Sequence, residues 1–302
     1  MKVFSVAAVL LAGALWGTMG IFVRTLSAAG YSSMEIVAVR IWVTLISLGV
    51  YLLIGNRKKL KVRLKDLWCF FGAGIFSILF FSYCYFTTIQ LTSLSVACIL
   101  LYTAPAFVMV LSLFLFRETI TLQKLMALVL AFAGCVMVTG LGAGISLNWQ
   151  GVLLGLGSGF GYALYSIFGR YALDKGYDSV TVTFYTFAFA SVGSLFLVDL
   201  PGMAVRLTEN PGTILWFLGA GLVTGSCAYL LYTFGLSKME SSKASILATV
   251  EPVVATLIGI FLFQETLTFW SGMGILLVLA SLLLLNWKKR EHCKVCVEKE
   301  NM

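Results

Sequence analysis

Long apolar stretches, separated by short polar segments, run through the whole chain. A helix needs about 20 apolar residues to cross the hydrocarbon core of a bilayer. Stretches of about this length predict ten membrane-spanning helices, at residues 4–26, 34–54, 66–88, 93–116, 121–142, 149–172, 180–199, 211–235, 241–263 and 268–287. None of them alternates polar and apolar residues in the manner of a membrane β-barrel strand. The pattern therefore predicts an all-α integral membrane protein.

Residues 97–121 contain a pattern that returns later in the chain. A shift of 147 positions carries Pro105 onto Pro252 and repeats Phe-Leu-Phe-x-Glu-Thr-x-Thr, at residues 114–121 and 261–268. The duplication predicts two five-helix halves, residues 1–145 and 146–288, followed by a tail at residues 289–302. Because five is odd, the second half enters the membrane from the opposite side. We therefore expect inverted repeats, which are the physical basis of alternating access in many transporters.

The basic residues indicate the orientation of the spans. The net charge is +8, and all Lys and Arg residues except Arg24, Arg40 and Arg206 fall on one side when the N-terminus is placed in the cytoplasm. Short cytoplasmic loops carry an excess of Lys and Arg, so we expect both termini in the cytoplasm. The basic residues lie in short loops beside apolar spans, which argues against a nucleic-acid-binding role.

Composition excludes several classes of protein. The chain is 60% hydrophobic and 11% charged, whereas soluble domains are about 25% charged. The seven cysteines are scattered and imply no disulfide framework. Together with His292, the tail residues Cys293 and Cys296 supply fewer ligands than a zinc site needs, so we expect no metal and no cofactor. The HExxH motif is absent, so we expect that the protein is not an enzyme and has no catalytic residues. The Walker A motif is also absent, so we expect that ATP does not drive it directly.

Several motifs together resemble the drug/metabolite transporter superfamily, specifically its EamA-type ten-helix members. They are Leu15-Trp16-Gly17, the proline-centred fourth and ninth spans, and Glu251-Pro252. The resemblance extends to about Lys288. It implies a secondary transporter of small metabolites, often an exporter, with its site between the halves near mid-membrane. The family handles amino acids, nucleosides, sugars and drugs, so the substrate stays open.

This resemblance predicts a small-molecule substrate and a multi-pass location in the cell membrane, which we expect to be a bacterial cytoplasmic membrane. A facilitative channel-like permease and an intramembrane enzyme are the alternatives. The enzyme lacks paired intramembrane carboxylates, and the channel lacks a ring of polar groups along its pore. Pairs of glycines four residues apart favour close internal packing, with dimerisation as the minor reading, so the protein is expected to be a monomer or homodimer.

Glu251 is the only acidic residue near the middle of a predicted span. A carboxylate at that depth is costly, and intramembrane ionisable groups are functional by default. We predict contact with a substrate amine or coupling to protons. The alternative is a structural residue that hydrogen-bonds the backbone freed by Pro252.

Aromatic and small polar residues of several spans are expected to line the site around Glu251. Tyrosine hydroxyls need partners in an apolar medium, which favours a wet cavity over lipid, although Trp and Tyr also form belts at membrane interfaces. The predicted substrate-binding residues are Trp16, Gly20, Tyr83, Tyr102, Tyr162, Ser166, Tyr229 and Glu251, and Tyr232 is a further candidate.

Prolines and helix-end charges predict moving parts. Pro105 and Pro252 each remove a helix hydrogen bond, which produces a kink that is either a hinge or fixed. Two gate ion pairs are expected, one near each mouth, formed by Arg24 with Glu265 and by Arg170 with Glu118. The alternative for each arginine is snorkelling to lipid phosphate.

Arg40 lies about two turns into the second predicted span and has no basic counterpart in the other half. It is expected either to attract an anionic group or to cap the outer cavity.

Overall fold

The computed structural model describes residues 2–140 and 148–287, and within these ranges the secondary structure is entirely helical. The first group of helices occupies residues 2–139. They are α1 (Lys2–Gly17), α2 (Met19–Ala28), α3 (Ser33–Gly55), η1 (Arg57–Leu60), η2 (Leu64–Asp66), α4 (Leu67–Phe71), η3 (Gly72–Leu79), α5 (Phe80–Leu91), α6 (Leu94–Leu101), α7 (Ala104–Phe116) and α8 (Leu122–Thr139).

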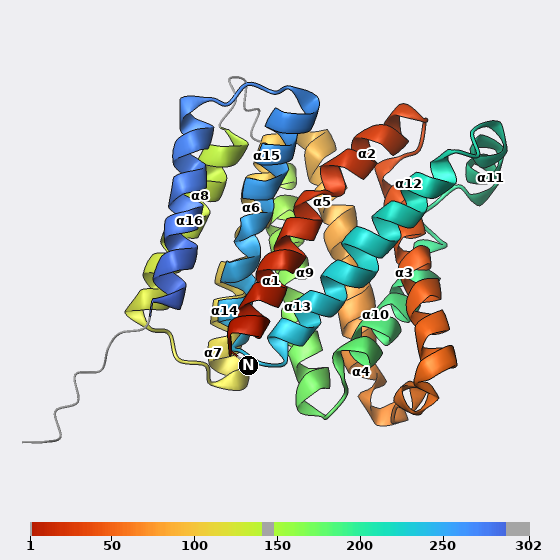
Figure 1. The fold of residues 1–302 in the computed structure, drawn as a ribbon, viewed down its shortest axis with the longest axis horizontal. Coiled ribbons are helices and arrows are strands. Elements are labelled where there is room, and N and C mark those ends of the chain that lie inside the picture. The colour runs from red at the N-terminus through yellow and green to blue at the C-terminus, as the bar shows by residue number, and fades with distance from the viewer. Residues whose placement is uncertain (1, 141–147, 288–302) are drawn as a thin grey trace, which may run out of the picture.

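The second group of helices begins at residue 149. They are α9 (Trp149–Asp174), α10 (Ser179–Ser194), α11 (Leu200–Glu209), α12 (Thr213–Gly219), η4 (Ala220–Cys227), α13 (Ala228–Leu236), α14 (Ser241–Leu247), η5 (Ala248–Val250), α15 (Glu251–Phe263) and α16 (Phe269–Asn286). Figure 1 shows α1 and α9 running through the bundle in opposite directions.

Nine helical stretches of the described residues are long and apolar enough to cross a membrane. They coincide with nine of the ten predicted spans, and their bounds are Val3–Ala28, Ser33–Gly55, Leu64–Leu91, Leu94–Phe116, Leu122–Thr139, Trp149–Asp174, Thr213–Leu236, Ser241–Phe263 and Phe269–Asn286. The length of an apolar run is a local property, which explains this agreement.

The stretch predicted as a span at 180–199 differs from that expectation. Here α10 is 16 residues long, which at 1.5 Å per residue gives about 24 Å, short of the ~30 Å hydrocarbon core. The chain then turns, and Asp199 accepts a hydrogen bond from the Gly202 N–H to begin α11 with Pro201 in its first turn. A proline is well tolerated there because that position needs no intrahelical N–H bond.

Three of the spans are interrupted rather than continuous. The first breaks at Thr18, between α1 and α2, and the fourth breaks between α6 and α7, just before Pro105. The ninth changes from α14 through the short 3₁₀ turn η5 into α15, where Pro252 occupies the first turn. Prolines that were expected to kink continuous helices therefore start new ones, as their fixed φ favours.

Two spans each contain a π-helical segment. These segments, η3 and η4, occupy corresponding places in the two halves of the chain that the sequence repeat relates. A π-helix carries more residues per turn than an α-helix and is frequently found at functional sites. It also rotates the side chains that follow it relative to an uninterrupted α-helix. Register calculated from the sequence therefore fails beyond it.

Other local features recur at the shift seen in the sequence. Arg117 and Gln264, which end α7 and α15, are the non-glycine residues with positive φ in the described ranges, at 54° and 56°. A left-handed backbone is uncommon for residues with a Cβ. The N–H of the next residue, Glu118 or Glu265, bonds to a carbonyl six positions back, that of Ser112 or Gly259. The two turns share one backbone conformation.

Glycines bring the first helix of each region against the interrupted helix of the other. A Cβ at Gly13 in α1 would lie 2.9 Å from the carbonyl oxygen of Ala248, and a Cβ at Gly159 in α9 would lie 2.8 Å from that of Leu100. A Cβ at Gly17 would likewise meet the carbonyl oxygen of Glu251 at 2.7 Å. These glycines serve internal packing, as close helix approach requires.

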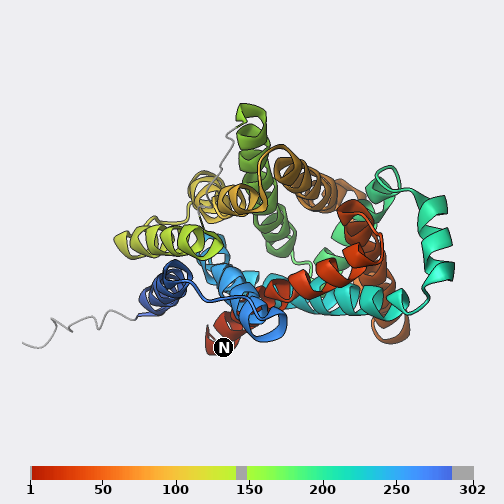
Figure 2. The ribbon, with the colours of Figure 1, turned by 90° about the horizontal axis from the view of Figure 1, so that it is seen from above.

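Seen from above, α8 and α16 stand as a pair at one end of the molecule and α11 lies at the other (Figure 2). The largest buried cluster extends from α8 and α16 into the bundle, where it contains Trp16, Tyr165, Tyr229 and Tyr232. This aromatic centre is where the candidate site is found.

Candidate functional site

Trp16, near the end of α1, is the centre of an aromatic cluster drawn from α9 and α13. Its ring centroid lies 6.1 Å from that of Tyr162, 5.1 Å from that of Tyr229 and 5.3 Å from that of Tyr232. Tyr165 packs against Tyr229 at 5.0 Å. Aromatic pairs at these separations stabilise one another beyond the burial of their area. The cluster therefore forms a fixed wall.

Several buried polar atoms of this wall have specific partners. Trp16 Nε1 donates to the carbonyl oxygen of Thr224 at 3.1 Å. The hydroxyls of Ser166 and Tyr232 are 2.6 Å apart, and those of Tyr165 and Thr233 are 2.7 Å apart. Buried hydroxyl groups without partners are costly, so these bonds hold the rings in place.

A small cavity lies against the cluster. It is lined by Trp16, Ser77, Ile78, Phe81, Tyr162, Tyr165, Ser166, Tyr229 and Tyr232. Four of the predicted residues, Trp16, Tyr162, Ser166 and Tyr229, are thus brought together, as is Tyr232.

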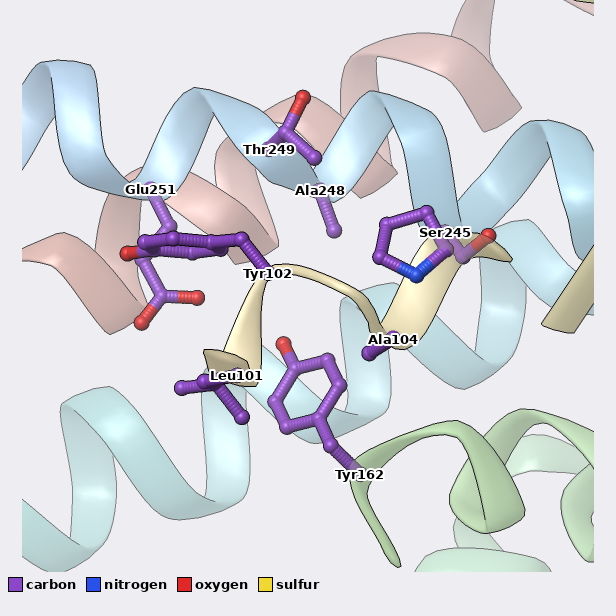
Figure 3. Close-up of a pocket in the computed structure, with 9 residues that line it drawn as sticks. Leu101, Tyr102, Ala104, Tyr162, Ser245, Ala248, Thr249 and Glu251 are labelled. Carbon is purple, nitrogen blue, oxygen red and sulfur yellow. The ribbon is translucent and has the colours of Figure 1, made fainter. Parts of the chain in front are cut away.

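A second small cavity lies beside the breaks in the fourth and ninth spans. It is lined by Leu101, Tyr102, Ala104, Pro105, Tyr162, Ser245, Ala248, Thr249 and Glu251 (Figure 3). Tyr162 lines both cavities, so the aromatic cavity and the cavity containing Glu251 adjoin one another.

Glu251 is the first residue of α15 and is partly buried. Its side chain points from α15 into the second cavity, and the hydroxyl end of Tyr162 points into the same space from α9 (Figure 3). Both side chains line this cavity. None of the ion pairs of the described residues includes Glu251.

Two of the predicted binding residues lie elsewhere. Tyr83 is 53% exposed and lines neither cavity, whereas Ser77 and Phe81 do. The π-helical segment η3 precedes Tyr83 and changes the register that the α-helical pattern implied. Gly20 is exposed, and nothing lies within 4 Å of a Cβ built on it. The break at Thr18 separates it from the face of Trp16.

The lining residues not predicted include Tyr165, Phe81, Ser77, Ser245 and Thr249. Tyr165 had a signal in the sequence, because it follows Tyr162 by three positions and so lies on the same helical face. No sequence signal distinguishes the other four from the many small or aromatic residues of neighbouring spans.

One predicted gate contact is present. Arg24 forms an ion pair with Glu265, and its guanidinium also lies 4.2 Å from the centre of the Phe263 ring. About half of each charged side chain is exposed. A role as a gate stays a prediction.

The other predicted gate contact is not formed. Arg170 instead pairs with Asp174 at 2.8 Å, one turn further along α9, and donates to the carbonyl oxygen of Met239 at 2.9 Å. Glu118 accepts hydrogen bonds from the backbone N–H groups of Ser241 and Ser242, at 2.6 and 3.1 Å. A carboxylate at a helix N-terminus satisfies free N–H groups and the helix dipole, and α14 begins at this position.

Charged side chains in loops that are predicted to face the cytoplasm form an ion pair between the first and the second half of the chain. Asp66 is fully buried and binds Lys175 at 2.8 Å, the Tyr177 hydroxyl at 2.8 Å and Arg63 at 2.7 Å. This network ties the segment before α4 to the turn after α9.

No metal-binding group of His, Cys, Asp or Glu occurs among residues 2–140 and 148–287. The five cysteines of that part of the chain are free thiols. Cys293 and Cys296 lie outside the described residues.

A family model described as the EamA-like transporter family matches the chain twice, at residues 3–140 and 149–287. The two matches meet close to the division at 145 and 146 that the internal repeat predicts. They leave out only short segments of the chain.

Curated relatives are similar over most of their length. A protein of Archaeoglobus fulgidus named "Uncharacterized transporter" is 29% identical over 278 residues, covering 92% of this chain and 94% of its own. YxxF of Bacillus subtilis, also named an uncharacterized transporter, is 22% identical and covers 94% of this chain and 90% of its own. A solved crystal structure is 16% identical, with a TM-score of 0.75, covering 93% of this chain and 96% of its own, and shows the fold alone.

Proposed function

The chain belongs to the EamA-like transporter family, and from this premise we propose that it is a secondary transporter that exports small organic metabolites, such as amino acids or related solutes, by alternating access. The observation that carries the proposal is the pair of adjoining cavities that share Tyr162 beside the interrupted helices. Walls that combine aromatic and aliphatic side chains with a few convergent polar groups suit a small organic solute.

The nine apolar helical stretches of the described residues and the family membership make this chain a multi-pass protein of the cell membrane. Its partners are therefore the lipid bilayer and a small-molecule substrate. The finer arrangement is part of the proposal: ten spans, with α10 as the seventh, form two inverted five-helix halves with both termini in the cytoplasm. The double match of the family model and the opposite directions of α1 and α9 support it (Figure 1).

Alternating access in this arrangement is a rocking of the two halves about the shared cavities. Each half contributes an interrupted helix and a first helix packed against the interrupted helix of the other half. A solute between them is exposed to one side at a time, because the helix ends beside it move with opposite halves. The Arg24–Glu265 ion pair would open and close with this motion at one mouth, and the hydrogen bonds of Glu118 at the other.

Glu251 is proposed to bind a cationic group of the solute, and protonation of its carboxyl group would release that group. The carboxyl group lies where α15 begins, and a moving break beside Pro252 would carry it from one side to the other. Position 104, its counterpart at the start of α7, is alanine. A charge-dependent step can therefore occur at one of the two breaks.

Replacing Glu251 by Gln tests this role. We expect roughly a tenfold loss of transport, the typical effect of losing one charge-assisted hydrogen bond, and the loss of any pH dependence. The measurement is efflux from inverted membrane vesicles or liposomes with the purified protein, with and without a pH gradient. Glu209→Gln, at the exposed end of α11, is the matched control.

Wild-type rates in the Glu251→Gln variant at every pH would refute the role of Glu251. Exchange measurements separate a carrier from a channel-like permease: a carrier moves labelled solute faster when unlabelled solute is present on the opposite side. The absence of such acceleration would contradict alternating access.

A further inference from the structure

Arg40 is a buried cation with almost nothing bound to it. The residue is 7% exposed and lies in α3, about two turns from the start of that helix. Its Nη1 has one weak contact, with the thioether sulfur of Met19 at 3.9 Å, and its Nε has no hydrogen-bond partner. A guanidinium carries five N–H donors, and burying them unpaired is costly. Such a group in a membrane span is a candidate binding residue.

The one carboxylate of the helix that carries Arg40 has other partners. Glu35, the nearest acidic residue in its own helix, pairs with Arg206 and accepts from the backbone N–H of Ser32. None of the ion pairs among residues 2–140 and 148–287 includes Arg40. The contrast with Arg206, a helix-borne arginine on the same side that has its carboxylate, indicates that Arg40 is not simply part of a structural ion pair.

A chain of contacts joins Arg40 to the aromatic cluster. The Met19 sulfur that meets Arg40 also accepts a hydrogen bond from the Thr224 hydroxyl, at 3.4 Å. The carbonyl oxygen of Thr224 accepts from Trp16 Nε1. Arg40 is therefore linked to the aromatic cluster through Met19 and Thr224.

Glycine makes room for the Thr44 side chain, which lies beside the backbone of Arg40. A Cβ at Gly225 of η4 would lie 3.6 Å from Cγ of Arg40 and would collide with the Thr44 hydroxyl. The Thr44 hydroxyl donates to the carbonyl oxygen of Arg40 at 2.8 Å and to that of Gly221 at 3.1 Å. The backbone that carries Arg40 is thus held rigidly against the π-helical segment, as a preformed binding group requires.

We propose that Arg40 binds the carboxylate of the transported solute, so that the site selects small molecules with a carboxylate and an apolar or aromatic body. Guanidinium and carboxylate form two parallel hydrogen bonds, which favours this group over a neutral one. A phosphate dianion fits less well, because a single guanidinium cannot neutralise it and Glu251 repels it. A solute with both carboxylate and ammonium groups satisfies Arg40 and Glu251 together.

This inference rests on the proposed transport function, but its first test measures binding alone. Purified protein is melted in the presence of four compounds that share a phenyl ring: L-phenylalanine, L-phenylalaninamide, 3-phenylpropionate and phenethylamine. We expect L-phenylalanine to stabilise the wild-type protein at concentrations roughly tenfold lower than L-phenylalaninamide, the effect of one charge-assisted hydrogen bond. We also expect 3-phenylpropionate to stabilise it more than phenethylamine does.

Variants then assign the preference to Arg40. Arg40→Gln should remove the preference for L-phenylalanine over its amide, and Arg40→Lys should retain part of it, because lysine keeps the charge but loses the two-bond geometry. Arg57→Gln, in the exposed η1 segment, should behave as the wild type. The comparison of acid and amide in the wild type can refute the proposal even where a variant does not fold.

Equal stabilisation of the wild type by L-phenylalanine and L-phenylalaninamide would overturn the proposal, as would an unchanged preference in Arg40→Gln or no stabilisation by any of the four compounds. Vesicle transport of the same compounds separates the two proposals. Arg40-dependent binding without transport of any compound would refute the transporter and leave the carboxylate site standing. Equal transport of acid and amide would refute the carboxylate site and leave the transporter standing.

Discussion

At the scale of single residues, equal positions in the two repeated segments have acquired different partners. Glu118 and Glu265 follow left-handed residues in identical turns. Glu118 is bonded to the start of α14, including the Ser242 hydroxyl at 2.5 Å, whereas Glu265 forms an ion pair with Arg24 at the exposed surface. The backbone repeats, but the side-chain chemistry does not.

This difference predicts unequal stability effects. Glu118→Ala should lower the free energy of unfolding by about 1–2 kcal/mol, because it removes the acceptor for the first N–H groups of α14. Glu265→Ala should lower it by at most about 1 kcal/mol, because both partners of that ion pair are half exposed. Denaturant titration of the purified variants measures both. Equal losses would contradict the assignment of Glu118 as a helix cap.

At the scale of elements, the contact between α8 and α16 depends on two glycines that face each other. A Cβ at Gly134 would lie 2.8 Å from the carbonyl oxygen of Gly274 and 2.7 Å from Cγ2 of Val278. The hydroxyl of Ser281 donates to the carbonyl oxygen of Ala127 at 2.6 Å across the same interface. Small residues and one interhelical hydrogen bond are the usual means of helix association in lipid.

Gly134→Ala should therefore destabilise the pair by roughly 1–3 kcal/mol, the typical cost of overpacking, because the atoms it meets include backbone that cannot rotate away. Gly272→Ala is the matched control, since nothing lies within 4 Å of a Cβ at that helical glycine. It should be neutral or slightly stabilising, as alanine favours helix more than glycine does. Thermal unfolding of both variants measures the two effects. A loss of stability in Gly272→Ala as large as in Gly134→Ala would contradict the importance of the close approach of α8 to α16.

At the scale of the whole molecule, polar contacts join the two repeated regions on the side predicted to face the cytoplasm. Lys59, in η1, pairs with Asp178 at 3.0 Å, and the Thr181 hydroxyl donates to the carbonyl oxygen of Lys59 at 2.9 Å. Asp178 also accepts from the N–H groups of Val180 and Thr181, so it caps α10. One carboxylate thus holds both a helix start and a contact between the regions.

Acid should weaken this contact. Burial raises the pKa of the Asp178 carboxyl, but hydrogen bonds from the Thr181 N–H and from Lys59 outweigh burial and hold its pKa below the usual value. A pKa lowered by folding adds stability above the ordinary pKa of the unfolded chain, and that stability is lost as pH falls through the lower folded pKa.

Asp178→Asn keeps a capping side chain but loses the ion pair. The melting temperature of the wild type should exceed that of Asp178→Asn at neutral pH, and the difference should shrink as the pH falls below about 4, the pKa of an unperturbed aspartate. Melting curves between neutral pH and acid measure it. A difference that is constant over this range would show that Asp178 does not act through its charge.

The sequence alone determined the class of the protein, nine of the helical spans and the repeated features at Pro105 and Pro252. These follow from apolar run length and from self-similarity, which are properties of contiguous segments. It also singled out Trp16, Tyr162, Tyr229 and Glu251, because aromatic and ionisable groups are conspicuous at mid-span.

Only the tertiary structure decided which groups meet. Tyr83 lies outside the cavities because a π-helical segment precedes it. Glu118 accepts hydrogen bonds from the start of α14 and does not pair with Arg170. Glu35 pairs with Arg206, whereas Arg40 has no carboxylate partner. Each of these outcomes depends on the register of a helix or on residues more than a hundred positions apart in the chain. Local pattern determines whether a segment enters the membrane, whereas a polar group buried there bonds to whichever partner the packing brings within reach.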